Sequence, residues 1–320
     1  MQIGFWGWLL FNAFILGMLA LDLGVFHRRA HEVHVREALR WTVVWFLLAL
    51  TFNGWIYFRA GTETALQFFT GYVIEKTLSI DNIFVMVMIF SFFGVPLKYQ
   101  HKVLFWGVLG ALVMRGTFIG IGTYALHHWH AVMYLFGALL VVTGVRMVFK
   151  QEDQPDMNKN VILRLARQLL PVSHHFEGKH FFVRQRGRLL ATPLFIVLLL
   201  IEVSDLIFAV DSIPAIFAIT DDTFIVYTSN VFAILGLRSL YFVLRDIVTR
   251  FTYLKYGLGV VLVFIGVKML IADIYEVPTL ISLLVLTVVF GITIVVSSKF
   301  PPPEPAVQPV PAPEVEVVEV

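Results

Sequence analysis

Apolar residues dominate this chain in runs of about 20, separated by polar connections. A run of that length lets an α-helix cross the hydrocarbon core of a bilayer. The pattern predicts nine membrane-spanning helices, near residues 4–26, 41–59, 65–93, 103–126, 131–149, 191–213, 223–244, 255–273 and 278–298. The third and sixth segments are longer than a straight crossing needs, so each is expected to tilt, break or protrude. We therefore expect an all-α, polytopic membrane protein.

Composition supports this assignment, because 58% of the residues are apolar and only 14% are charged, compared with about 25% charged in ordinary soluble domains. The chain contains no cysteine, which excludes disulfides, thiolate metal sites and cysteine nucleophiles. Its formal net charge of +2 gives no indication of a nucleic-acid partner. We find no nucleophile–base pair and no metalloprotease motif, so we do not expect an enzyme.

Basic residues alternate along the connections between the predicted helices. The connections 27–40 and 151–190 are rich in arginine, whereas the connection that holds Asp221 and Asp222 carries no base. Because basic connections remain in the cytoplasm, the N-terminus is predicted outside and the C-terminus in the cytoplasm. The apolar start at Ile3 lacks a basic region and predicts a first span, not a signal peptide.

Two stretches of three predicted helices resemble each other. A tyrosine, two glycines, a base and a methionine recur at identical spacing, as Tyr134, Gly137, Gly144, Arg146 and Met147 and again as Tyr256, Gly259, Gly266, Lys268 and Met269. Earlier in each stretch, two carboxylates lie six residues apart, Glu75 with Asp81 and Asp205 with Asp211. Because each unit has three spans, the second starts on the opposite side of the membrane. This predicts an inverted 3+3 helix repeat, the plan of many secondary transporters, with a site at the repeat interface.

The repeat divides the chain into six parts. They are two N-terminal helices in 1–60, the first three-helix unit in 61–150, a basic cytoplasmic connection in 151–190, the second unit in 191–275, the last helix in 276–298 and a tail in 299–320. Within the basic connection, residues 161–170 place Arg164 and Arg167 at helical spacing, which predicts a short amphipathic helix on the membrane or a loop helix over the spans. The proline-rich, acidic tail is expected to be disordered.

Carboxylates inside apolar runs are the main functional signal, since inserting a charge there costs roughly 2.5–3.5 kcal/mol. There are five in two segments: Glu75, Asp81, Glu202, Asp205 and Asp211. On an unbroken helix Glu202 and Asp211 point to opposite faces, so one straight helix cannot aim all of them at one ion. Because Pro214 lacks the donor for the Val210 carbonyl, we predict unwinding near 211–214, with a symmetry-related break at 81–82.

The polar groups of these segments are oxygen donors, which suits a hard divalent cation such as Mn²⁺, Mg²⁺ or Ca²⁺. The predicted metal site comprises Glu75, Asp81, Asn82, Glu202, Asp205, Asp211 and Ser212. Ser79 and Ser204 are further candidate donors. Alternatively, the buried carboxylates pair with bases in the spans, for which the candidates are Lys76, Arg115 and Arg238.

The segments 75–85, 180–184, 202–218 and 229–238 resemble the signature segments of the TerC family, in its Alx-like branch. The resemblance covers most of residues 1–298 and excludes the tail. It implies a bacterial inner-membrane protein, a link to tellurium-resistance loci and an activity in manganese export. It also implies a family requirement for the same five carboxylates.

These observations predict a membrane transporter that exports divalent cations, Mn²⁺ above all. Asp81 and Asp211 would bind the ion, and Glu75, Glu202 and Asp205 would complete the site or carry a coupling proton. No tightly bound cofactor is expected, and the partners are the metal ion, the lipid bilayer and candidate membrane proteins. Two alternatives stay open: a cation/proton exchanger for another ion such as Ca²⁺, and a membrane partner in assembly or metalation of exported proteins.

Overall fold

The structure, a computed structural model, describes residues 3–24, 35–149, 171, 173, 178–185, 188–245, 253–275 and 277–299. Helices account for most of them: α1 (Phe5–Gly24), α2 (Val35–Phe92), α3 (Leu97–His128), α4 (Ala131–Phe149), α6 (Pro193–Phe217), α7 (Thr223–Leu235), α8 (Leu237–Leu244), α9 (Leu254–Leu270) and α10 (Thr279–Lys299). Two short strands, β1 (Phe182–Gln185) and β2 (Arg188–Ala191), form an antiparallel hairpin before α6. The predicted all-α class is therefore correct except for this hairpin.

The predicted spans correspond to helices, with one difference at a glycine residue. The second and third spans are the two halves of α2, which meet at Gly61 (φ 88°, ψ 178°), within the predicted connection and in the left-handed region that glycine tolerates. The seventh span is the pair α7 and α8, bent by 41° at Gly236. Among the described residues, four helices, or five if this bent pair is one span, are long and apolar enough to cross a membrane.

The predicted helix breaks at the acidic segments are wrong. The α6 helix continues through Asp211 and Pro214 to Phe217, and α2 stays helical across Asp81 and Asn82. Pro214 lies in the last turn of α6, where it removes one hydrogen bond shortly before the helix ends. The acidic side chains are therefore arranged around continuous helices, not around freed backbone carbonyls.

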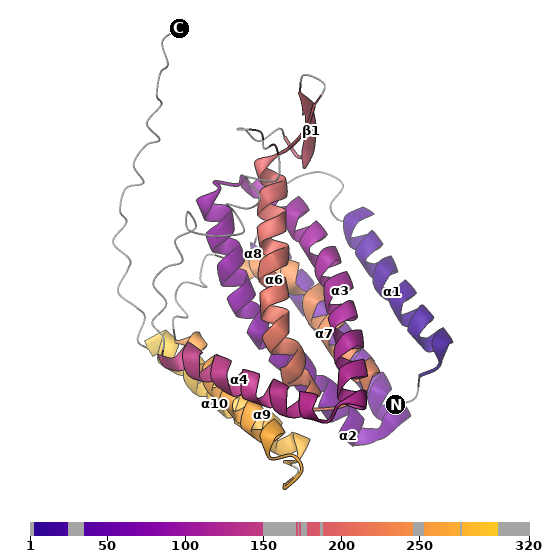
Figure 1. Cartoon of the computed structure of the whole chain (residues 1–320). Helices are drawn as coiled ribbons and strands as arrows, with labels where there is room; N and C mark the ends of the chain where they lie inside the picture. Colours follow the sequence, from indigo (N-terminus) through magenta and orange to yellow (C-terminus); the bar gives the residue numbers. More distant parts are fainter. Residues whose placement is uncertain are drawn as a thin grey trace.

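The helices form two packed groups (Figure 1). The α4, α9 and α10 helices lie together and are steeply inclined to α3 and α6. The α9 helix packs against both α4 and α10, while α2 contacts α6, α7 and α8. A buried apolar cluster that includes Leu140, Ile213 and Ile265 joins the two groups. The acidic segments of α2 and α6 lie beside this junction.

Four glycines lie at the α4–α9 contact, and they are those that recur at identical spacing in the two predicted units: Gly137 and Gly144 in α4, and Gly259 and Gly266 in α9. A Cβ added to Gly144 would lie 2.5 Å from the carbonyl oxygen of Gly259, and one added to Gly266 would lie 2.7 Å from that of Gly137. In both contacts the second glycine of one helix faces the first glycine of the other. This is expected for like helices packed antiparallel about a two-fold axis. The contact is consistent with an inverted repeat of the three-helix units, which remains a prediction.

Three predicted features fall wholly or partly outside the described residues. The amphipathic helix predicted for 161–170 lies outside them, and so does the tail beyond Lys299. The basic connection 151–190 is described only in its last part, where strand β1 and the start of β2 are found.

Candidate functional site: a buried acid–base network beside a cavity

Arg115, near the middle of α3, bridges the two acidic segments. Its Nε and Nη2 atoms donate to the two carboxylate oxygens of Asp205 in α6, at 3.0 and 2.8 Å. Its Nη1 atom donates to the Glu75 carboxylate in α2. The exposed fractions of Arg115, Glu75 and Asp205 are only 2%, 0% and 4%. One guanidinium group therefore pairs with two buried carboxylates, as expected for charges removed from water.

Two amides complete this network. Asn82 of α2 donates to Asp205 Oδ1 at 3.1 Å. Asn230 of α7 donates to Glu75 Oε2 at 3.1 Å and lies with its Oδ1 atom 3.3 Å from Arg115 Nη1. The hydroxyl of Ser212 also lies 3.3 Å from Arg115 Nη1. Helices α2, α3, α6 and α7 thus meet in one polar centre inside an apolar bundle.

A cavity of about 350 Å³ adjoins the network and contains most of the predicted metal ligands. Asp81 and Asp211 line it, together with Glu75, Asn82 and Ser212. The cavity is also bordered by two bases, Arg115 and Arg146, and by Thr143, Met147 and Leu262. The hydroxyl of Thr143 donates to Asp211 Oδ1 at 3.1 Å. The structure therefore brings together carboxylates from α2 and α6, as the sequence predicted.

Glu202 is separated from this cavity. Its carboxylate lies against Gly110 of α3, where an added Cβ would be 2.1 Å from Oε1. Glu202 lines a small void together with Arg238 and Asp205. None of these three residues lines the cavity that contains Asp81 and Asp211. Glu202 and Asp211 thus line different spaces, and their predicted position on opposite faces of α6 stays a prediction.

Ser79 and Ser204 do not contribute hydroxyl protons to the network. Each donates to the carbonyl four residues earlier in its own helix, at 2.7 and 2.8 Å. Within the described part of the chain, no group of three or more histidine and acidic side chains is arranged to hold a metal ion. At Glu75 and Asp205, the guanidinium of Arg115 binds the carboxylates instead.

Of the three bases considered as partners for the carboxylates, Arg115 forms ion pairs with both acidic segments. Lys76 instead donates to the carbonyl oxygen of Ala233 at 3.0 Å. Sequence reasoning did not identify Asn230 or Thr143. Asn230 could have been noticed as a polar residue in an apolar run, but nothing in the sequence distinguishes Thr143.

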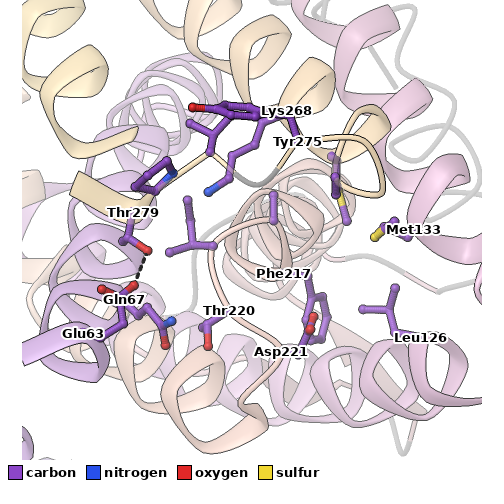
Figure 2. Close-up of a pocket in the computed structure, with 16 residues that line it drawn as sticks. Glu63, Gln67, Leu126, Met133, Phe217, Thr220, Asp221, Lys268, Tyr275 and Thr279 are labelled. Atoms are coloured by element: carbon purple, nitrogen blue, oxygen red, sulfur yellow. Dashed lines mark hydrogen bonds between the residues drawn. The ribbon is translucent and has the colours of Figure 1, made fainter. Parts of the chain in front are cut away.

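A second cavity of about 350 Å³ lies where the ends of several helices meet (Figure 2). The side chain of Lys268 extends into it, and Thr279 Oγ1 donates to Glu63 Oε1 at 2.8 Å. Gln67, Thr220 and Asp221 also line it. The cavity borders the connections between α6 and α7 and between α9 and α10, which the sequence predicts to lie outside the cytoplasm.

Five helices, α2, α3, α4, α6 and α9, line both cavities. On each helix a buried apolar residue lies between the two sets of lining positions: Ile74, Ile119, Leu140, Ile213 and Ile265. All of them belong to one apolar cluster. Buried apolar side chains of one cluster therefore lie between the two cavities.

These features define a polytopic helical membrane protein with a buried acid–base network between its helices. Residues 60–301 match the integral membrane protein TerC family, and the chain belongs to this family. It is 51% identical over 290 residues to an uncharacterized membrane protein of Myxococcus xanthus, covering 91% of each chain. It is 49% identical over 286 residues to an Escherichia coli K12 protein named "Putative membrane-bound redox modulator Alx", covering 87% of this chain and 88% of that one. No solved structure matches the chain.

Proposed function

We propose that this protein is a membrane transporter that exports divalent metal cations, Mn²⁺ above all, through the cavity between α2 and α6. The observation that carries the proposal is that Asp81 and Asp211, from two separate helices, line one cavity within the apolar bundle. Carboxylates are costly at such a depth and typically mark an ion pathway in membrane proteins. Asn82 and Ser212 add oxygen donors to the same wall.

The charge of the site favours a divalent cation. Glu75, Asp81 and Asp211 line the cavity. Asp205 forms an ion pair with Arg115, which also lines it. With Arg115 and Arg146 as the bases of the site, four carboxylates face two guanidinium groups, a formal excess of two negative charges. Because unbalanced charge is unfavourable in a low-dielectric interior, one divalent ion would be attracted and would neutralise the excess.

The donor chemistry favours Mn²⁺, Mg²⁺ and Ca²⁺ over softer metals. Carboxylate, amide and hydroxyl oxygens suit these three ions, and the chain has no cysteine to bind softer ones. Met147 lines the cavity as well, and a thioether is tolerated better by Mn²⁺ than by Mg²⁺ or Ca²⁺. This supports Mn²⁺ as the preferred ion, with Ca²⁺ as the alternative to compare.

Two cavities separated by an apolar layer are the arrangement that alternating access requires. Only one side of a carrier can be open to the binding site at a time, so a closed layer must lie between the site and the other side. Here buried apolar side chains around Ile213 and Leu140 lie between the proposed site and the Lys268 cavity, and we propose that they form this layer. We propose that movement of α4 and α9 relative to α2 and α6 opens this layer during transport.

The redox role in the name of the E. coli relative leads to a related proposal. Without cysteine, this chain cannot exchange thiols and disulfides through its own residues. If a redox role extends to this chain, we propose that it acts through the supply of a redox-active metal such as manganese.

The test is Mn²⁺ transport by the purified full-length chain in proteoliposomes, with Mg²⁺ and Ca²⁺ compared in parallel. We expect Asp81→Asn and Asp211→Asn each to lower the Mn²⁺ rate by about tenfold or more, as for loss of a metal ligand. Asp273→Asn is the matched control, because Asp273 is a half-exposed acid bonded to Tyr134 and lies outside the cavity lining. Equal rates in all three variants would refute the site assignment. Transport of Ca²⁺ in preference to Mn²⁺ would establish the alternative ion, and no transport by the unaltered chain would refute the proposal.

A further inference from the structure

We propose that Arg115 is a tethered cation that occupies the acidic network when no metal is bound and is displaced when the transported ion arrives. This inference rests on the proposed function and specifies how the site is regulated. It assigns Arg115 a role in ion release in addition to its structural ion pairs.

Arg115 contacts the predicted ligands of the ion directly. It binds both oxygens of Asp205 in a bidentate arrangement and one oxygen of Glu75. Its Nη1 atom lies 3.3 Å from the hydroxyl oxygen of Ser212. A metal ion and a guanidinium group cannot use the same oxygen lone pairs at once. Binding of the ion to Glu75 or Asp205 therefore requires Arg115 to release them.

Burial couples the two events. Glu75 and Asp205 have exposed fractions of 0% and 4%, so loss of the guanidinium would leave two buried carboxylates without their charged partner. Removing one partner of a buried ion pair leaves an uncompensated charge, which is strongly unfavourable. The arrival of a divalent cation supplies the replacement charge, and the departure of the ion allows Arg115 to return.

The structure also provides space for the displaced side chain. Arg115 forms part of the wall of the cavity of about 350 Å³ that Asp81 and Asp211 line. A cation bound at these two aspartates would occupy only part of this volume and leave the rest for the displaced side chain. Its charge would weaken the ion pairs of the guanidinium before the ion takes over the carboxylates.

The experiment measures Mn²⁺ affinity by calorimetry on the full-length protein in nanodiscs, and Mn²⁺ transport in proteoliposomes. In Arg115→Lys the charge is kept but the bidentate fork is lost, so the competitor is weaker. We expect Mn²⁺ to bind severalfold more tightly and to be transported more slowly, because release is no longer assisted. Arg115→Gln removes the competitor and is expected to bind Mn²⁺ about tenfold more tightly.

A purely structural role predicts the opposite sign, since loss of the ion pairs would disorder the site and weaken binding. Arg238→Lys is the control, because Arg238 is a buried arginine that lines the void beside Glu202 and not the cavity. Unchanged or weaker binding in Arg115→Lys would overturn the inference even if Arg115→Gln does not fold. If the unaltered protein binds Mn²⁺ and Asp81→Asn does not, unchanged or weaker binding in Arg115→Lys would overturn the role of Arg115 and leave the proposed function standing. If the unaltered protein binds no divalent cation, both proposals fail.

Discussion

The hydroxyl of Thr143 in α4 donates a hydrogen bond of 3.1 Å to the carboxylate of Asp211 in α6. This bond connects the last helix of the first predicted repeat to the first helix of the second. It holds one oxygen of Asp211 in the wall of the cavity that also contains Asp81. The position of a proposed metal ligand therefore depends on a helix that carries none of the predicted ligands.

Replacing Thr143 with valine removes this hydrogen bond and keeps the shape of the side chain. Hydrogen bonds to charged groups contribute about 1.5–3 kcal/mol, so orientation of Asp211 should weaken measurably. We expect a severalfold rise in the KM for Mn²⁺ transport and a smaller change in kcat. Thr117→Val is the control, because Thr117 is exposed on α3 and donates only to the carbonyl of Val113. A KM equal in both variants would show that the bond does not position the ligand.

Asn230 should contribute to stability more than an ordinary buried polar residue. It is fully buried, donates to Glu75 and accepts from Arg115, so leucine in its place leaves both charged groups short of a partner. We expect Asn230→Leu to lower the free energy of unfolding by about 1–3 kcal/mol. The measurement is denaturant-induced unfolding in detergent micelles.

The control for Asn230 lies on the same helix. Thr228 is equally buried, but its hydroxyl donates only to carbonyls of α7 at 2.7 and 3.4 Å. Thr228→Val should therefore have a much smaller effect. Equal losses in the two variants would mean that the network contributes no more to stability than a local hydrogen bond.

Sequence alone could predict the helices and the set of carboxylates, because apolar length and buried charge are both visible in the chain. It could not predict which side chains meet. Helices that are apolar on all sides show little periodicity, so the face that carries Thr143 or Asn230 cannot be read from the pattern. The choice of Arg115 as the partner also depends on packing, since Lys76 lies directly beside Glu75 in sequence yet donates to Ala233.

The helix breaks were mispredicted for a similar reason. Pro214 was expected to unwind α6, but near the end of a helix the missing hydrogen bond has little consequence. The interruption at Gly61 falls between two predicted spans, whereas the bend at Gly236, inside the predicted span 223–244, was not predicted. Glycine is common in membrane helices, so its presence alone does not predict a bend.

Close packing of α4 on α9 gives a third prediction. A side chain at Gly144 would meet the Gly259 carbonyl at 2.5 Å, so Gly144→Val must separate the two helices. Overpacking of this kind costs about 1–3 kcal/mol. We expect a lower unfolding temperature in detergent for this variant. Gly120→Val in α3 has no atom within 4 Å of the added Cβ and should leave that temperature nearly unchanged. Similar unfolding temperatures would contradict the proposed importance of the glycine contact.

The apolar layer between the cavities can be tested with single cysteines, because the chain has none of its own. Ala218 lines the Lys268 cavity, whereas Ala215, one turn earlier on α6, is fully buried in the apolar cluster. We expect Ala218→Cys to react with a membrane-impermeant thiol reagent applied from the extracytoplasmic side. Ala215→Cys should remain unreactive in the absence of metal, because the layer is closed.

Addition of Mn²⁺ should then change the reactivity at one position only. If transport opens the layer, Ala215→Cys becomes reactive during turnover, while the reactivity of Ala218→Cys stays high throughout. Asp211→Asn introduced into the Ala215→Cys chain serves as the control, because loss of a proposed ligand should prevent opening. Reaction of Ala215→Cys without Mn²⁺ would show that the layer is not a barrier. If neither Ala218→Cys nor Ala215→Cys reacts with the reagent, with or without Mn²⁺, the Lys268 cavity does not lie on the transport path.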